Sequence, residues 1–278
     1  MKALLAFGLA CLKLLAQDRQ TSAPPADNFD KKANLVYADY GSRQMHLDLY
    51  LPKGSEGPFP AVVYIFGGGW RGGDKNHFSR QATYMASKGF AGACIEYRLS
   101  GEAKYPAAFD DSVAAVQWVR AHAKEYHIDP DRIGAAGGSS GGHLAGLLGT
   151  MQGRIVQAVA AFNPVLDLTA LTNPSALEFA SQFLGATYAE KPSLWAEASP
   201  AKHVNKSSAP FLFLHGDADT MVPYRQSVDM RDQLVAAGVP AELFTASGAN
   251  HAFFNGPPWF DPTLKRMEEF FVKYLTGR

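Results

Sequence analysis

The feature that most constrains this chain is a glycine-rich run, residues 137–142, which separates two apolar stretches. The stretch at 132–136 is short and suits a strand, whereas the stretch at 143–148 suits the start of a helix. A sharp turn from strand to helix across a glycine-flanked serine is the pattern of a nucleophile elbow, whose glycines leave room around the serine oxygen. The alternative, a flexible glycine-serine loop, is not expected between a buried strand and a buried helix.

The motif by itself does not choose between two serines. The spacing Gly-x-Ser-x-Gly is satisfied around Ser139 and again around Ser140. We favour Ser139 as the nucleophile, because two glycines then occupy the second and third positions after it, where the helix begins against the strand. In that register Ser140 supplies a backbone N–H group to an oxyanion.

A serine hydroxyl is a weak nucleophile that needs a base, and the base needs a carboxylate to orient it. Two later loops, residues 215–223 and 248–253, each follow an apolar run and supply these groups. His251 is the predicted base, and Asp219 is preferred to Asp217 as the acid because Asp217 is expected to bond local backbone in its turn. Both loops are expected at the carboxyl ends of strands, where open α/β sheets place their sites.

Residues 66–70, Phe-Gly-Gly-Gly-Trp, end another apolar run and offer donors for an oxyanion. Glycines let backbone N–H groups approach a tetrahedral oxyanion closely, so we predict Gly68, Gly69 and Ser140 as the oxyanion hole. The same loop also fits the Gly-x-Gly-x-x-Gly pattern of dinucleotide sites. That alternative is weaker, because Trp70 would crowd a pyrophosphate and the serine, acid and histidine would stay unexplained.

The histidines and cysteines form no ligand pattern such as His-Glu-x-x-His or Cys-x-x-Cys, so no metal and no cofactor are predicted. His143, on the expected elbow helix, and His215, at a strand end, are interpreted as packing or turn residues. Cys94 lies in an apolar run and is interpreted as a buried core thiol.

Composition narrows the possible partners. The chain has 278 residues, of which 47% are hydrophobic, and no long polar linker divides it, so a single domain is expected. Its 26 basic and 26 acidic residues balance, and no basic run is present, which argues against a nucleic-acid partner. A neutral or weakly polar substrate fits this balance, and the oligomeric state stays open.

The N-terminus has the pattern of an export signal. Residues 1–16 combine a charged start with an apolar run that is too short to span a bilayer stably, and a polar, proline-containing segment follows. We predict a signal peptide at 1–16, a flexible lead-in at 17–30 and a secreted or periplasmic protein. Lipoprotein anchoring through Cys11 is disfavoured because Gly8 stands where a branched apolar residue is wanted.

Residues 31–278 are predicted to form one α/β domain. Alternation of apolar and polar side chains at 34–38 and 44–51 indicates an antiparallel hairpin. Near-continuous apolar runs, which suit strands buried on both faces, lie at 61–66, 90–95, 132–136, 155–162 and 211–214. Helical stretches lie between the strands, the clearest at 107–126 and 262–275. The alternation predicts a mostly parallel central sheet with an N-terminal antiparallel hairpin and helices on both faces.

Two segments that join predicted strands and helices allow further predictions. Asp-Pro-Asp at 129–131 is expected to form a turn before the elbow strand. Residues 167–209 are the one long interval between strands and show helical spacing at 177–184. This interval is predicted to form a small lid.

Together these motifs resemble the α/β-hydrolase esterases of the hormone-sensitive-lipase-like and bacterial feruloyl-esterase-like type. The resemblance extends from Asn34 to the C-terminus and is carried by Gly-Gly-Gly-Trp at 67–70, Gly-Asp-Lys at 73–75, Glu-Tyr-Arg-Leu at 96–99, Tyr-Pro at 105–106, Asp-Pro-Asp-Arg-Ile at 129–133, Gly-Gly-Ser-Ser-Gly-Gly-His-Leu-Ala at 137–145, His-Gly-x-x-Asp-x-x-Val-Pro at 215–223 and Asn-His-Ala-Phe at 250–253. It implies an α/β-hydrolase fold with Ser139 as nucleophile, Asp219 as acid and His251 as base. It likewise implies an oxyanion hole of Gly68, Gly69 and Ser140.

The chain departs from this family pattern at Phe66, where the family usually has a histidine. Hydrogen bonds that brace the glycine loop must therefore come from other residues. The predicted hairpin stands in place of the helical N-terminal cap of the lipase-like branch, which favours the feruloyl-esterase-like branch.

The resemblance implies a serine carboxylesterase that acts through an acyl-enzyme on a small-molecule or oligosaccharide ester. The missing N-terminal cap and the single small lid at 167–209 imply an open cleft, which favours short-chain or hydroxycinnamoyl esters of saccharides over long acyl chains. Trp70, Tyr105, Phe254 and Trp259 lie in loops and are predicted to contact the substrate, because aromatic faces suit sugar rings or a phenolic acyl group. An amide or formamide hydrolase or a peptidase with the same residues is one alternative. A binding protein that keeps the hydrolase fold without activity is another.

Overall fold

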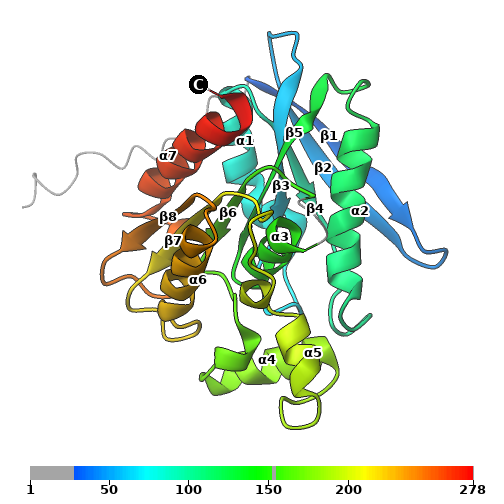
Figure 1. Cartoon of the computed structure of the whole chain (residues 1–278). Helices are drawn as coiled ribbons and strands as arrows, with labels where there is room; N and C mark the ends of the chain where they lie inside the picture. The colour runs from blue at the N-terminus through cyan, green and yellow to red at the C-terminus, as the bar shows by residue number, and fades with distance from the viewer. Residues whose placement is uncertain (1–27, 152–154, 278) are drawn as a thin grey trace, which may run out of the picture.

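The computed structural model describes residues 28–151 and 155–277 (Figure 1). The predicted signal peptide and most of the predicted lead-in lie outside the described residues. Within them, eight strands form one sheet in the order β1-β2-β4-β3-β5-β6-β7-β8. The strands are β1 (Phe29–Asp39), β2 (Gln44–Pro52), β3 (Phe59–Ile65), β4 (Ala91–Ile95), β5 (Ile128–Gly138), β6 (Val159–Phe162), β7 (Phe211–Gly216) and β8 (Ala241–Ala246).

Strand directions agree with the predicted architecture. β2 pairs antiparallel with both β1 and β4, whereas the other neighbouring strands pair parallel. The prediction of a mostly parallel sheet with an N-terminal antiparallel hairpin is confirmed. β1 begins at Phe29, so the end of the segment predicted to be flexible is part of a strand.

Helices cover both faces of the sheet, as Figure 1 shows. Side chains of α2, α3 and α6 belong to one hydrophobic core and those of α1 and α7 to another. Consecutive β3 residues alternate between them, with Val63 in the first core and Val62 and Tyr64 in the second, which explains the unbroken apolar run. The helices are α1 (Ser79–Ser87), α2 (Ala107–Ala121), α3 (Ser140–Thr150), α4 (Pro174–Leu184), α5 (Pro192–Glu197), α6 (Arg225–Ala236) and α7 (Phe260–Phe271). Among these described helices, none combines the length and the apolar character that crossing a membrane requires.

Several predicted ends of strands and helices differ from those in the structure. Residues 129–131 lie inside β5 rather than before it, in an irregular stretch between its pairings with Phe59 and Ala61 of β3, and the Asp131 amide donates to Asp129 Oδ1 at 2.9 Å as in the predicted turn. The strand predicted at 155–162 is shorter, since β6 begins at Val159. The helix predicted at 107–126 ends at Ala121. The final predicted helix starts earlier, at Phe260, and its regular part ends at Phe271.

The interval predicted as a lid, residues 167–209, is called the cover segment below. It contains α4 and α5, which Figure 1 shows apart from the helices that cover the sheet. The start of α4 is well defined, because the Asn173 side chain accepts from the amides of Ser175 and Ala176. Gly185, with a φ of 73°, ends the helix in the left-handed conformation typical of this position.

Candidate active site

Ser139 stands between the carboxyl end of β5 and the first turn of α3, with a φ of 54° and a ψ of −117°. A non-glycine residue with this backbone conformation is strained. Crowding explains its glycine neighbours, because a Cβ on Gly137 would lie 2.3 Å from the Gly141 carbonyl oxygen and one on Gly141 would lie 2.1 Å from the Ile65 carbonyl oxygen. Only glycine fits at these two positions, so the tight turn from strand to helix requires this local sequence.

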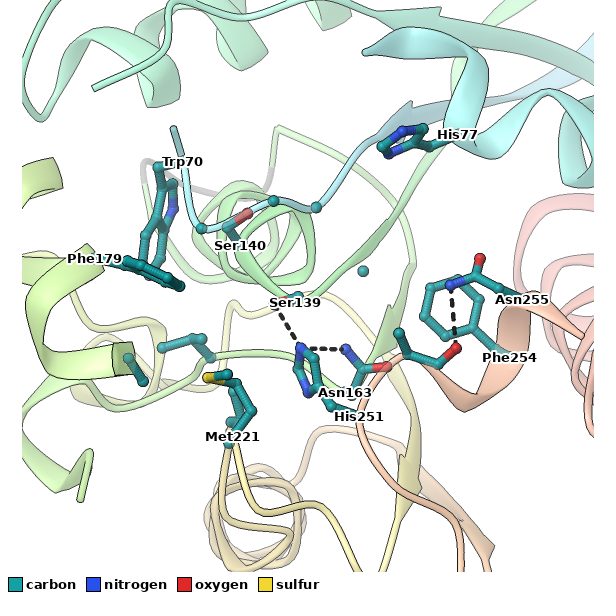
Figure 2. Close-up of a pocket in the computed structure, with 18 of the residues that line it drawn as sticks. Trp70, His77, Ser139, Ser140, Asn163, Phe179, Met221, His251, Phe254 and Asn255 are labelled. Carbon is teal, nitrogen blue, oxygen red and sulfur yellow. Dashed lines mark hydrogen bonds between the residues drawn. The ribbon is translucent and has the colours of Figure 1, made fainter. Parts of the chain in front are cut away.

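Side chains from three separate loops meet beside this turn. The Ser139 hydroxyl lies 2.9 Å from Nε2 of His251 (Figure 2), and Nδ1 of His251 lies 2.7 Å from Oδ2 of Asp219. Asp219 follows β7 and His251 follows β8, so both come from the carboxyl edge of the sheet, as Ser139 does. Asp217 instead accepts a hydrogen bond from the Gly248 amide at 2.6 Å, and Ser140 is buried in the first turn of α3.

The Asp219 carboxylate is enclosed by donors. Its Oδ1 accepts from the amides of Met221 and Val222 at 2.8 and 2.9 Å, and its Oδ2 faces both His251 and Nε2 of His215. Burial raises the pKa of this carboxyl, but hydrogen bonds from His215, His251 and Val222 outweigh burial and hold the pKa well below its ordinary value. The side chain is therefore a carboxylate at neutral pH, able to stabilise a protonated imidazole.

His215 is a site residue that the sequence interpretation missed. Its ring is buried, with Nε2 3.1 Å from Asp219 Oδ2 and Nδ1 2.7 Å from the Ser227 hydroxyl. The ring thus contacts the same carboxylate oxygen, Oδ2, that faces His251. The spacing of four residues between His215 and Asp219 is the sequence signal that could have revealed this contact.

The glycine loop, residues 66–70, follows β3 and contains three consecutive left-handed residues, Gly68, Gly69 and Trp70, with φ of 136°, 64° and 57°. Within the described part of the chain, the amides of Gly68, Gly69 and Ser140 have no hydrogen-bond acceptor, and these residues line a cavity with Ser139. Their N–H groups are therefore available to an oxyanion. Gly67, which the sequence analysis left out, also lines the cavity, and a Cβ on it would lie 3.3 Å from Ser139 Cβ.

Tyr97 braces the start of this loop at Phe66, the position where the resemblance predicts a histidine. The Phe66 ring stacks on Tyr97 with ring centroids 4.3 Å apart. The Tyr97 hydroxyl donates to the Phe66 carbonyl oxygen at 3.1 Å. A side chain from outside the loop thus supplies the hydrogen bond that Phe66 cannot make.

A cavity of about 510 Å³ opens over Ser139. Most of its wall is apolar and is formed by Trp70, Phe78, Val165, Leu171, Ala176, Phe179, Met221, Val222 and Phe254. Ala176 and Phe179 belong to α4, so the cover segment supplies part of this wall. Figure 2 shows Phe179 on one side of Ser139, and the polar side chains of His77 and Asn255 on the other.

Asn163 is a second residue that the sequence analysis missed. It follows β6, is buried and has a φ of 34°. Its Nδ2 lies 3.4 Å from Nε2 of His251, as Figure 2 shows, while its Oδ1 has no hydrogen-bond partner among the described residues. Its position directly after an apolar run was the available signal, since such positions meet at the carboxyl edge of the sheet.

The four aromatic residues predicted to contact substrate separate into two pairs. Trp70 and Phe254 line the cavity. Tyr105 and Trp259 lie outside its lining: Tyr105 packs edge-on against Phe183, and Trp259 packs against other aromatic rings. These two residues therefore lie apart from the cavity lining, because the Tyr105 ring packs on buried Phe183 and the Trp259 ring packs on the partly buried rings of Phe244 and Phe253.

Comparison with known proteins identifies the group to which these features belong. The family model BD-FAE matches residues 47–234. LipM of Mycobacterium tuberculosis, named a probable carboxylic ester hydrolase, is 31% identical over 220 residues, which are 72% of this chain and 51% of the relative. The chain spans about half the length of the curated relatives that it matches.

Two solved structures have closely similar folds. Butyrate-bound esterase Est2 of Thermogutta terrifontis matches with a TM-score of 0.77 and 28% identity, over 92% of this chain and 98% of that one. A truncated carbohydrate esterase from gut microbiota matches with a TM-score of 0.79 and 27% identity, over 91% of this chain and 99% of that one. The α/β-hydrolase fold predicted from the sequence is thereby confirmed.

Proposed function

Because this chain belongs to the BD-FAE family, we propose that it is a serine carboxylesterase. The observation that carries the proposal is the hydrogen-bonded series from Ser139 through His251 to Asp219, beside backbone amides that lack acceptors in the described structure. A base within reach of a hydroxyl, a carboxylate behind the base and free N–H donors are the groups that acyl transfer needs.

In the proposed reaction, Ser139 Oγ attacks the ester carbonyl carbon while its proton passes to Nε2 of His251. Asp219 stabilises the imidazolium through Nδ1, and the new oxyanion accepts hydrogen bonds from Ser140 and the glycine loop. Collapse breaks the bond to the alcohol oxygen, which takes the proton from His251 and leaves an acyl group on Ser139. Water then gives a proton to Nε2 of His251 while its oxygen attacks the acyl carbon. Collapse of this second tetrahedral intermediate breaks the bond to Ser139 Oγ, which takes the proton back from His251 as the acid leaves.

We propose short-chain or hydroxycinnamoyl esters of saccharides as substrates. The largely apolar cavity of about 510 Å³ suits a short or aromatic acyl group better than a long flexible chain. His77 and Asn255 offer polar contacts to an alcohol in another part of the wall. The similar structures support this choice, since one is bound to butyrate and the other is named a carbohydrate esterase.

A hydrolysis panel with fluorophosphonate labelling tests both parts of the proposal. The panel contains p-nitrophenyl acetate, butyrate and dodecanoate, methyl ferulate and acetylated xylan. We expect the acetyl and butyryl esters to be cleaved faster than the dodecanoyl ester, release of acetate or ferulate, and a fluorophosphonate adduct on Ser139. Fastest cleavage of the long-chain ester without attack on any saccharide ester would exclude the carbohydrate substrate. A folded protein that neither labels nor hydrolyses would refute the esterase assignment.

The N-terminal pattern supports a separate proposal, that the protein is exported and cleaved after Ala16. Mass spectrometry of the mature N-terminus after expression in a bacterium tests it. An uncleaved chain confined to the cytosol would contradict it.

A further inference from the structure

Trp70 has an unusual backbone conformation for a large side chain. It is the third consecutive left-handed residue of the glycine loop, with a φ of 57°, where a non-glycine residue is strained. The residue is 2% exposed, and its carbonyl oxygen accepts from the Ser100 amide at 2.7 Å. Contacts around Trp70 must therefore hold it there, and they hold the adjoining amides of Gly68 and Gly69 with it.

The imidazole of His143 makes the polar side-chain contact to Trp70. Trp70 Nε1 donates to Nδ1 of His143 at 3.3 Å, and Nε2 of His143 lies 2.7 Å from the Ala198 carbonyl oxygen. An indole N–H can only donate and a carbonyl can only accept, so these partners fix the tautomer with the hydrogen on Nε2. Burial lowers the pKa of His143 to about 4, which agrees with a neutral ring at physiological pH.

Three parts of the site meet at this one ring. His143 is on α3, the helix that begins immediately after Ser139. Trp70 ends the glycine loop, and Ala198 belongs to the cover segment. Phe183 of α4 completes the cluster, with its ring stacked on Trp70 at 4.7 Å and edge-on to His143 at 5.6 Å.

We propose that His143 is a positioning residue that holds the oxyanion-hole amides in place through Trp70, an inference that rests on the proposed esterase function. Without an acceptor, the buried Trp70 N–H would lose its partner, and the strained loop would relax toward a different path. The amides of Gly68 and Gly69 would then move relative to Ser139. A displacement of about 1 Å in such donors can cost about 10²-fold in rate.

Two substitutions at His143 separate this role from simple packing. Glutamine can accept from Trp70 through Oε1 and donate to Ala198 through Nε2, whereas leucine fills the space without either bond. We expect His143→Leu to lower kcat for p-nitrophenyl butyrate by about 10- to 100-fold with KM changed by less than about threefold. The variant should bind a butyl trifluoromethyl ketone, whose adduct places an oxyanion among these amides, more weakly by a similar factor. We expect His143→Gln to retain kcat within about threefold of the wild type.

A double-mutant cycle of Trp70 and His143, together with a control substitution far from the site, completes the test. Trp70→Phe removes the donor, so combining it with His143→Leu should be no worse than the poorer single variant. His122→Leu is the matched control, because His122 stacks on Trp118 at 4.0 Å on the α2 side of the molecule and lies outside the cavity lining. Urea unfolding of every variant confirms that each is folded under the assay conditions.

The possible results are distinct. A His143→Gln enzyme as impaired as His143→Leu, or additive losses in the cycle, would show that the imidazole acts only by packing and would overturn the inference. Normal kcat and ketone binding in His143→Leu would overturn it equally. Failure of the wild-type protein to react with a fluorophosphonate would instead refute the proposed function on which the inference rests.

Discussion

The elbow at residues 137–142 and the glycine loop at residues 66–70 are both rich in glycine, but they need it for different reasons. In the elbow, Gly137 and Gly141 are required because main-chain oxygens of neighbouring elements leave no space for a Cβ, and the left-handed residue is Ser139. In the loop, Gly68 and Gly69 are themselves left-handed, and the oxygen that would crowd a Cβ on Gly68 belongs to nearby Gly72 rather than to a strand or helix. The elbow is fixed by the backbone of a strand and a helix, whereas the loop is held by side chains together with backbone hydrogen bonds such as that from Ser100 to Trp70. Changes in the elbow should therefore affect folding and activity together, and changes in the loop should affect mainly activity.

The largest expected effect distinguishes the two serines of the elbow. Ser139→Ala should lower kcat by about 10⁴-fold or more, because it removes the hydroxyl that lies 2.9 Å from Nε2 of His251. Ser140→Ala should cost far less, since the proposed role of Ser140 is through its backbone N–H. Steady-state hydrolysis of p-nitrophenyl butyrate measures both. An inactive Ser140→Ala enzyme beside an active Ser139→Ala enzyme would reverse the register.

The comparison of elbow and loop is tested directly by glycine substitutions. A Cβ on Gly68 would lie 2.2 Å from the Gly72 carbonyl oxygen, so Gly68→Val should distort the loop and lower kcat by about 10²- to 10³-fold with little change in the urea midpoint. Gly141→Ala should instead lower the urea midpoint strongly, because β3 cannot move away. Gly72→Ala is the control within the same region, since no atom of the described residues lies within 4 Å of its added Cβ. Equal loss of stability in the Gly68 and Gly141 variants would contradict the distinction.

His143, which connects the elbow helix to Trp70 of the glycine loop, should make the stability of the protein depend on pH. The pKa of buried His143 is lowered from 6.5 to about 4, so the unfolded chain binds a proton in this range that the folded chain does not. Above pH 6.5 His143 is neutral in both states and does not lower the free energy of unfolding. As the pH drops toward 4, protonation of His143 in the unfolded chain lowers the free energy of unfolding by about 3 kcal/mol. Urea unfolding of the wild type and of His143→Gln between these pH values should show a shallower slope in the variant. Parallel slopes would mean that His143 does not titrate between the two states.

The smallest effect is expected at the start of the loop. Phe66→His restores the residue that the family usually has, but Tyr97 already donates to the Phe66 carbonyl oxygen. We therefore expect activity within about tenfold of the wild type, because the oxyanion donors are backbone groups. Tyr97→Phe is the complementary variant, and it should lower kcat more than Phe66→His does. Kinetics on p-nitrophenyl butyrate rank the two, and the opposite order would exclude Tyr97 as the brace.

Sequence reasoning succeeded where local chemistry determines structure. The apolar runs located the parallel strands because both faces of this sheet are buried, and the crowding at Gly137 and Gly141 left a readable motif around Ser139. The loops after β7 and β8 could be assigned because strand order places their ends at one edge. The same reasoning could not locate β5 at Ile128, since its irregular pairing accommodates an Asp-Pro-Asp sequence that usually forms a turn.

Contacts between segments that are distant in the sequence could not be predicted from local patterns. His215 stands in the motif at 215–223 but was interpreted as a packing or turn residue, and Asn163 belongs to no motif. Both enter the site because β6 and β7 end beside the strands that carry Ser139 and His251. For the aromatic loop residues the sequence predicted too many contacts, since Trp70 and Phe254 line the cavity but Tyr105 and Trp259 do not. Nothing local distinguishes Trp70, which lines the cavity, from Trp259, which covers other rings, because the packing of the loop decides which face of the ring is open.

The left-handed conformation of Ser139 has a consequence for evolution and engineering of this fold. Holding a serine at a φ of 54° costs about 1–3 kcal/mol, and glycine would relieve that cost at the same backbone angles. Ser139→Gly should therefore melt at a higher temperature than Ser139→Ala, although both lack the hydroxyl. Selection for thermal stability alone would favour an inert glycine at this position, so the proposed function requires a residue that lowers the stability of the fold.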